Sequence, residues 1–247
     1  MKAIILAAGR GKRMGSLTDD RPKCFVSLSK KPLIQWQLEA LQGAGIEGIG
    51  LVRGYMGELF TDPSIHYFTN SRWSETNMVM SLVCAAEWLK KVTCIISYSD
   101  IVYSSDTVKR LMNSPGNIAI TYDADWFSLW SKRFANPLDD AETFSINENN
   151  CLTEIGGKTK NVEQIKGQYM GLLKITPEGY KTIETYLDSC SAQQRNKHDM
   201  TSMLSALLKR GAVINTVKVN GQWFEVDNEN DMNLYESLTK NTSGKLW

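Results

Sequence analysis

The chain has 247 residues, of which 42% are hydrophobic and 22% charged, as in ordinary globular proteins. Its 28 basic and 27 acidic residues give a formal net charge of +1, so charge provides no reason to expect nucleic acid or an anionic membrane as a partner. The five cysteines are scattered and form no C-x-x-C pair, so neither a zinc site nor a disulfide framework is indicated. The longest apolar run is far shorter than a membrane span and no signal-peptide pattern opens the sequence. We therefore expect a cytoplasmic protein without membrane insertion.

Apolar runs and helical repeats alternate along most of the chain. Residues 3–8 form a continuous apolar run, the pattern of a strand buried on both faces of a parallel sheet. The same criteria predict further strands at 49–52, 66–68, 92–98, 118–122, 171–175 and 214–219. They predict helices from 32 to 43, over 77–90 and 105–112, from 177 and over 199–210. Repeated strand–helix–strand units predict an α/β fold with a doubly wound, mostly parallel, Rossmann-like sheet.

The stretch from about 123 to 169 departs from this alternation. Short candidate strands at 143–146 and 151–155 are separated by turns that contain Asn and Gly. This pattern is typical of a small antiparallel lobe. Because no repeat or linker divides the chain, we predict a single domain over 1–247 with an inserted antiparallel lid at about 123–169.

The loop after the first strand combines glycines with basic side chains. Three glycines and three basic residues lie between positions 9 and 15, and Arg21-Pro22-Lys23 follows. Glycine allows backbone N–H groups to approach a phosphate closely, and ligands of open α/β sheets bind at the carboxyl ends of strands. The spacing fits neither of two common phosphate motifs, because Leu6 stands where a P-loop requires Gly and Met14 where the dinucleotide fingerprint requires its third Gly. The alternative is a solvated basic turn.

These residues carry a resemblance to a known family. The stretch Leu6-Ala7-Ala8-Gly9-x-Gly11-x-Arg13-Met14, followed by Arg21-Pro22-Lys23, resembles the signature of the nucleotidyltransferases that activate sugar phosphates and small alcohol phosphates. In that family the glycine-rich loop wraps the triphosphate and base, and the lysine of R-P-K contacts the phosphates. The resemblance implies that Arg13 and Lys23 bind the nucleotide and act in catalysis. It also implies nucleotide contacts by Leu6, Ala7, Ala8, Gly9, Gly11 and Lys12.

Nucleotidyl transfer requires a divalent cation, so the sequence should offer oxygen ligands at strand ends. Asp100 closes one apolar strand and Asp227 closes another, over 223–227. The resemblance implies that both aspartates bind Mg²⁺, with Ser99 beside the nucleotide. The alternative for each aspartate is a role at the start of the following helix.

A second acidic motif, Asp123-Ala124-Asp125, has the D-x-D form with which many glycosyltransferases bind their metal. Such an enzyme would use an activated sugar donor. The R-P-K motif instead belongs to enzymes that make activated donors, so we favour a loop or lid role for Asp123 and Asp125.

The segment 73–82 indicates which nucleotide is used. It resembles the E-T-N-N-x-x-S-L element of the small branch that uses CTP, which includes bacterial phosphocholine cytidylyltransferases. The resemblance implies that Thr76, Asn77 and Ser81 contact the nucleotide. Met78 replaces the second Asn of the element.

The acceptor is expected to meet the segment 126–134 and Tyr169. Trp126, Trp130 and Tyr169 would cage a choline ammonium or, equally, form the core of a small lobe, whereas Arg133 suits an acceptor carboxylate. The whole sequence resembles the cytidylyltransferases of capsular phosphoramidate assembly, which join CTP and phosphoglutamine to give CDP-glutamine. We therefore expect phosphoglutamine as acceptor, then phosphocholine, then a sugar 1-phosphate, and either a monomer or a homodimer.

Overall fold

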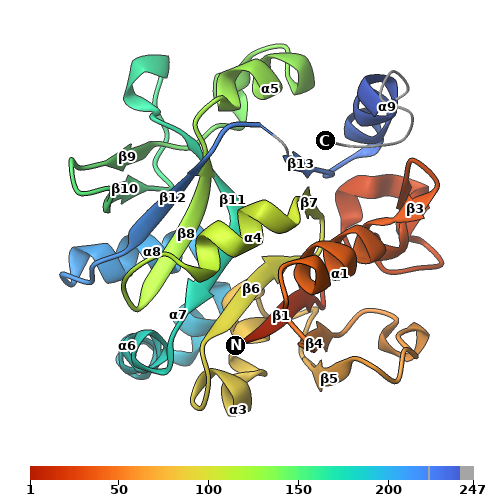
Figure 1. Ribbon diagram of the computed structural model, residues 1–247, viewed down its shortest axis with the longest axis horizontal. Coiled ribbons are helices and arrows are strands. Elements are labelled where there is room, and N and C mark those ends of the chain that lie inside the picture. The colour runs from red at the N-terminus through yellow and green to blue at the C-terminus, as the bar shows by residue number, and fades with distance from the viewer. Residues whose placement is uncertain (222, 240–247) are drawn as a thin grey trace.

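A seven-stranded sheet forms the centre of the computed structural model, which describes residues 1–221 and 223–239 (Figure 1). Its spatial order is β12-β8-β11-β6-β1-β4-β5. The strands are β1 (Lys2–Ala7), β4 (Gly48–Arg53), β5 (His66–Thr69), β6 (Cys94–Tyr98), β8 (Ile118–Asp123), β11 (Gln168–Ile175) and β12 (Asn215–Val219). Of these seven, β11 alone runs antiparallel to its neighbours, β6 and β8. The predicted α/β fold with a mostly parallel sheet is confirmed.

Helices cover both faces of this sheet because alternate strand residues point to opposite sides. Ile4 and Leu6 of β1 belong to one apolar core, and Ala3 and Ile5 belong to the other. The first core includes α2 (Met78–Val83), α3 (Ala86–Leu89), α6 (Pro177–Asp188) and α8 (Met200–Lys209). The second includes α1 (Leu33–Gly43), α4 (Ser105–Met112) and α5 (Trp126–Arg133). Within the described part of the chain, no helix has the length and apolar character needed to cross a membrane.

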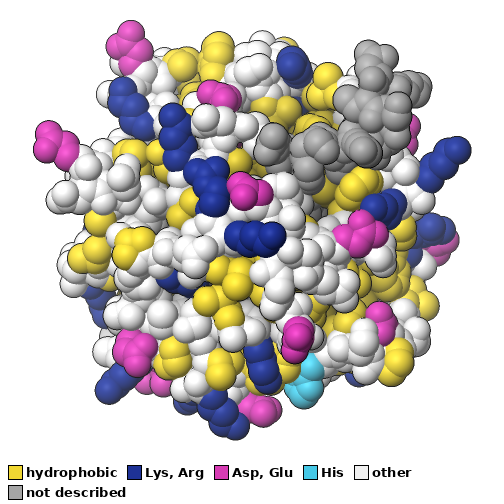
Figure 2. Space-filling view, in the orientation of Figure 1, with side chains coloured by type: hydrophobic (Ala, Val, Ile, Leu, Met, Phe, Trp, Pro, Cys, Tyr) yellow, Lys and Arg dark blue, Asp and Glu magenta, His cyan; other side chains and the backbone are white. Residues whose placement is uncertain are grey.

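Three small antiparallel sheets and two further helices complete the described fold. The sheets are β2 (Ser27–Leu28) with β3 (Lys31–Pro32), β7 (Ile101–Tyr103) with β13 (Trp223–Glu225), and β9 (Phe144–Ile146) with β10 (Leu152–Ile155). The helices are α7 (Ala192–Lys197) and α9 (Glu229–Thr239). On the face that carries α1 and α4, basic and acidic side chains are interspersed, as the net charge of +1 leads one to expect (Figure 2).

Several elements differ from the sequence-based expectation. The helix predicted over 77–90 is broken after Val83, because Ala85 departs from helical geometry with φ −96° and ψ 17°. Residues 126–133 form helix α5, although the surrounding stretch was expected to be an antiparallel lobe. The β9–β10 sheet does lie within 123–169. The lid function of that stretch and the extent of the domain remain predictions.

Candidate active site

The glycine-rich loop leaves the carboxyl end of β1 and turns into a 3-10 helix at Lys12–Thr18. Gly11 has φ +72°, and a Cβ at this position would lie 2.8 Å from Cδ of Lys23, so glycine is required for both the turn and the close approach. The backbone N–H groups of Gly9, Arg10 and Gly11 donate to no described protein atom. Open N–H groups of this kind are well suited to phosphate oxygens.

Lys23 is a buried cation held between two aspartates. It follows Pro22 in a short 3-10 turn, and its Nζ lies 2.7 Å from Oδ2 of Asp100 and 3.0 Å from Oδ1 of Asp227. Burial disfavours the charged ammonium, but the two carboxylates outweigh this effect and hold the pKa of Lys23 above its ordinary value. Lys23 is therefore a fixed positive charge beside the loop.

The pairing of β7 with β13 brings the two aspartates together. In this ladder Glu225 lies opposite Ile101, and the N–H of Val226 donates to the carbonyl oxygen of Asp100 at 2.9 Å. Oδ1 of Asp227 also accepts a hydrogen bond from Nη2 of Arg13 at 2.9 Å. Burial would raise the pKa of Asp227, but Lys23, Arg13 and Arg133 outweigh it and the pKa lies below its ordinary value. Asp227 is therefore ionised at neutral pH.

Asp100 and Asp227 together fit a divalent cation. Both already contact one cation, the Lys23 ammonium, so their positions allow a single positive charge to be shared. Oδ1 of Asp100 is buried and has no hydrogen-bond partner among the described residues. Two carboxylates completed by phosphate oxygens and water are a usual ligand set for Mg²⁺. In the described residues, no group of three or more His, Cys, Asp or Glu side chains could hold a metal.

Gln37 of α1 holds the turn that carries Asp100. Its side chain is fully buried, and Nε2 donates to the carbonyl oxygens of Tyr98 at 3.1 Å and Ile101 at 2.7 Å. These carbonyls flank Ser99 and Asp100, so one amide fixes both ends of the turn. Sequence reasoning missed Gln37. The available signal was a polar residue on the apolar stripe of a predicted helix.

Replacing Gln37 with Leu is expected to destabilise the protein by about 2 kcal/mol, because two buried carbonyls lose their donor. We also expect kcat to fall about tenfold, since Asp100 would no longer be fixed. Urea denaturation and steady-state kinetics measure the two effects. Gln35→Leu is the matched control, because Gln35 is exposed on the same helix and donates to Glu39. Equal losses in both variants would contradict the assigned role.

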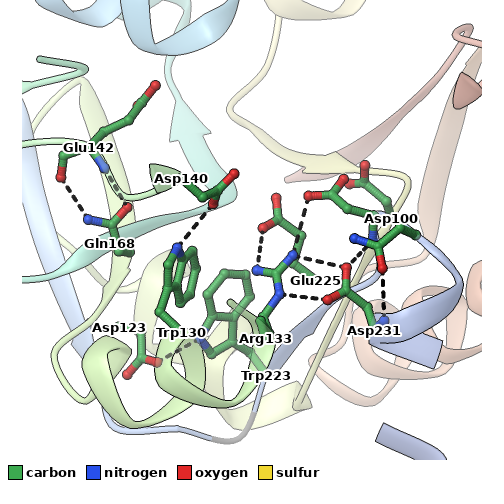
Figure 3. Close-up of polar contacts among 12 residues, drawn as sticks. Asp100, Asp123, Trp130, Arg133, Asp140, Glu142, Gln168, Trp223, Glu225 and Asp231 are labelled. Carbon is green, nitrogen blue, oxygen red and sulfur yellow. Dashed lines mark hydrogen bonds and ion pairs between the residues drawn. The ribbon is translucent and has the colours of Figure 1, made fainter. Parts of the chain in front are cut away.

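A cavity of about 280 Å³ opens beside Asp227. Its wall combines aromatic rings with acidic side chains. Among its lining residues are Arg13, Tyr98, Trp130, Asp140, Glu142, Tyr169, Asp199, Glu225 and Asp227. The rings of Tyr98 and Tyr169 meet edge to face with centroids 5.8 Å apart. Figure 3 shows the hydrogen bond that Nε1 of Trp130 donates to Asp140, at 3.0 Å. Such a wall favours a small ligand that carries a positive charge.

Residues 3–149, more than half of the chain, match the family model of the MobA-like NTP transferase domain. The chain is a nucleotidyltransferase of this family. Over 94% of its length, this nucleotidyltransferase is 38% identical to a CTP:phosphoglutamine cytidylyltransferase from Campylobacter jejuni, and the match covers 98% of that relative. It is 30% identical to a choline-phosphate cytidylyltransferase from Streptococcus pneumoniae, over 62% of this chain and 57% of the relative.

Solved structures confirm the fold of the nucleotidyltransferase. The CTP:phosphocholine cytidylyltransferase from Streptococcus pneumoniae superposes with a TM-score of 0.75 at 20% identity, covering 96% of this chain and 98% of the other. The inositol-1-phosphate CTP transferase from T. maritima gives a TM-score of 0.75 at 21% identity, covering 98% and 96% of the two chains.

The segment predicted to contact the nucleotide has mostly structural contacts in this nucleotidyltransferase. Asn77 caps α2 by accepting the N–H of Met78, and Thr76 donates to the carbonyl oxygen of Arg72. Ser81 is buried and accepts a hydrogen bond from Asn70 at 3.0 Å. These three side chains are absent from the wall of the cavity beside Asp227. Their nucleotide contacts remain predictions, as do those of Ser99 and the loop residues.

The four residues predicted to meet the acceptor separate into two pairs. Trp130 and Tyr169 line the cavity. Trp126 does not, because it is buried in the core of the second sheet face and its Nε1 donates to the carbonyl oxygen of Ile165. The side chain of Arg133 is fully buried among carboxyl groups, and Arg133 does not line the cavity. Trp126 and Arg133 therefore lie away from the cavity in which we expected the acceptor to bind.

The D-x-D motif is part of the scaffold of the nucleotidyltransferase. Asp123 is buried, with Oδ1 accepting the N–H groups of Asp125 and Gly221 and Oδ2 accepting Nε1 of Trp223 at 2.9 Å (Figure 3). Both of its carboxylate oxygens are therefore engaged. Asp123 is also absent from the wall of the cavity beside Asp227, so it lies apart from the candidate metal site.

Proposed function

We propose that this nucleotidyltransferase is a Mg²⁺-dependent cytidylyltransferase that transfers CMP from CTP to phosphoglutamine, giving CDP-glutamine and pyrophosphate. The observation that carries the proposal is the Asp100–Lys23–Asp227 cluster beside the glycine-rich loop. The choice of CTP and phosphoglutamine is supported by the 38% identity, over nearly the full length of both chains, to a protein of that activity. We place the reaction in the cytoplasm, as a step of capsular phosphoramidate modification.

The residues of the cluster suit an in-line displacement at phosphorus. An oxygen of the acceptor phosphate forms a bond to the α-phosphorus of CTP, and the bond from that phosphorus to the bridging oxygen of pyrophosphate breaks. The phosphoryl group of the acceptor, a phosphoramidate in phosphoglutamine and a phosphomonoester in phosphocholine, is already ionised at neutral pH, so no general base is required. Lys23 and Arg13 supply positive charge for the phosphates, and the loop N–H groups orient them. Mg²⁺ held by Asp100 and Asp227 would neutralise the charge of the triphosphate.

The cavity wall supports an acceptor that bears an ammonium group. Asp140, Glu142 and Asp199 contribute negative charge, and nearby aromatic rings can stack on a cation. Phosphoglutamine and phosphocholine both carry a positive charge, whereas a simple sugar 1-phosphate does not. Among the described residues of this wall Arg13 is the one basic side chain, and it is also needed for the phosphates. Phosphocholine, which has no carboxylate to be neutralised, is therefore the second candidate.

A substrate matrix tests the proposal. CTP, UTP, ATP and GTP are each combined with phosphoglutamine, phosphocholine and glucose 1-phosphate, and pyrophosphate is measured. We expect CTP with phosphoglutamine to give the highest kcat/KM. Preference for phosphocholine would establish the second candidate. Absence of pyrophosphate from every CTP combination would overturn the cytidylyltransferase assignment.

A further inference from the structure

Arg133 is the last residue of α5 and lies at the centre of a buried ionic cluster. Its Nε and Nη2 donate to the two carboxylate oxygens of Asp231 at 2.9 and 3.1 Å, and Nη1 donates to Glu225 at 3.0 Å. Nη2 also lies 3.3 Å from Oδ2 of Asp227. Figure 3 shows the guanidinium between Glu225 and Asp231. The side chain has no exposed surface.

The surroundings of Arg133 leave no room for a substrate group. The rings of Trp130 and Phe134 lie 4.9 and 5.1 Å from the guanidinium carbon, so aromatic contacts add to the ionic ones. An acceptor carboxylate would have to displace Glu225 or Asp231, and Asp231 would then lose its buried cation. Breaking such a buried pair is costly. Arg133 therefore acts within the protein.

We propose that Arg133 is a positioning residue that orients the Asp227 carboxylate for the metal ion. The proposal rests on the proposed function, because it takes Asp227 as a metal ligand. Arg133 meets Oδ2 of Asp227 on one side, while Lys23 and Arg13 meet Oδ1 on the other. Both carboxylate oxygens are thus fixed from different elements of the fold.

The backbone of Asp227 is fixed by the same cluster. Oδ2 of Asp231 accepts the N–H of Asp227 at 2.9 Å while it also accepts from Arg133. Asp231 in turn donates its own N–H to Oδ1 of Asn228 at the start of α9. Arg133 therefore controls Asp227 in two ways, directly at its carboxylate and indirectly through Asp231.

The geometry requires arginine at this position. The planar guanidinium presents donors in several directions and contacts three acidic side chains at once, whereas the ammonium of lysine is a single point of charge. The cluster also joins α5 to residues 225–231, because Arg133 of α5 contacts Glu225, Asp227 and Asp231 in that segment. A displacement of α5 would consequently disturb the metal ligand.

The test compares Arg133→Lys with Arg110→Lys, an exposed arginine of α4 that donates to the carbonyl oxygen of Lys218. Mn²⁺ binding is followed by electron paramagnetic resonance with CTP and no acceptor, and kcat and acceptor KM are measured separately. For Arg133→Lys we expect a Mn²⁺ dissociation constant about tenfold higher and kcat about 10 to 100-fold lower, as for other residues that orient metal ligands. The acceptor KM of Arg133→Lys should stay within about twofold of the wild-type value. Arg110→Lys should match the wild type in Mn²⁺ dissociation constant, kcat and acceptor KM.

Asp231→Asn provides a second variant should Arg133→Lys fail to fold. It retains the shape of the side chain but removes the charge that joins Arg133 to the Asp227 backbone, so the same weakening of Mn²⁺ binding is expected. Unchanged Mn²⁺ affinity with a raised acceptor KM would overturn the proposal in favour of an acceptor contact. A lower Tm with unchanged Mn²⁺ affinity and kcat would reduce Arg133 to a structural role.

The proposed function and the role of Arg133 can fail separately. If the wild type binds Mn²⁺ with CTP but uses none of the acceptors, the proposed acceptor is wrong, and weaker Mn²⁺ binding by Arg133→Lys still supports the positioning role. If the wild type binds no Mn²⁺ in the presence of CTP, Asp227 has no metal to be oriented toward and the positioning role is overturned.

Discussion

Asp227→Asn is expected to lower the rate of pyrophosphate release by about 10³-fold without unfolding the protein. Asparagine retains the shape of the side chain but loses the charge that a divalent cation requires. The fold should survive because Lys23 keeps its contact with Asp100 at 2.7 Å and Arg133 keeps Glu225 and Asp231. A coupled pyrophosphate assay and a circular dichroism spectrum measure the two expectations.

Asp125→Asn is the matched control for this experiment. Asp125 is exposed, and it belongs to the D-x-D motif that a glycosyltransferase would use. Asp125→Asn should retain full activity if the metal is bound by Asp227 and not by the D-x-D motif. Loss of activity in Asp125→Asn together with an active Asp227→Asn variant would reverse the assignment of the metal site.

The local sequence predicts the strands of the central sheet and the acidic residues that follow strand ends. The apolar run at 3–8 predicts β1 because a strand buried on both faces cannot alternate polar and apolar residues. Strand ends then predict where Asp100 and Asp227 lie. The sequence does not indicate that Asp100 and Asp227 contact the same lysine. The contact of Lys23 with both aspartates depends on the β7–β13 ladder, which joins segments far apart in the chain.

The residues that sequence reasoning missed or misplaced act through tertiary contacts. Gln37 looks like an ordinary polar residue of an amphipathic helix, and only the fold shows which carbonyls it meets. Arg133 is predicted to face an acceptor, because its guanidinium suits a carboxylate on that acceptor. Its burial depends on Asp231, which lies in α9 four residues after Asp227 and carries no motif of its own. Buried ionic clusters of this kind leave little local signal.

Lys23→Met should separate the catalytic role of the lysine from its structural role. Methionine replaces the aliphatic stem and removes the charge. Turnover is expected to fall about 10²- to 10³-fold, because the phosphates lose a fixed cation. In EDTA, the variant should also be less stable by about 3–5 kcal/mol, since Asp100 and Asp227 lose the buried ammonium between them. For a chain of this size, that loss corresponds to a fall in Tm of about 10 °C.

Magnesium should restore much of that stability. With the ammonium gone, a divalent cation is the remaining positive charge that both carboxylates can share, so Mg²⁺ should raise the Tm of Lys23→Met more than that of the wild type. Lys90→Met is the control, because Lys90 forms an exposed ion pair with Glu184 at 2.8 Å, and such pairs contribute about 0–1 kcal/mol. Differential scanning calorimetry with EDTA or Mg²⁺ measures these shifts. An equal Mg²⁺ effect on wild type and Lys23→Met would show that Asp100 and Asp227 do not share Mg²⁺ at the position that the ammonium leaves.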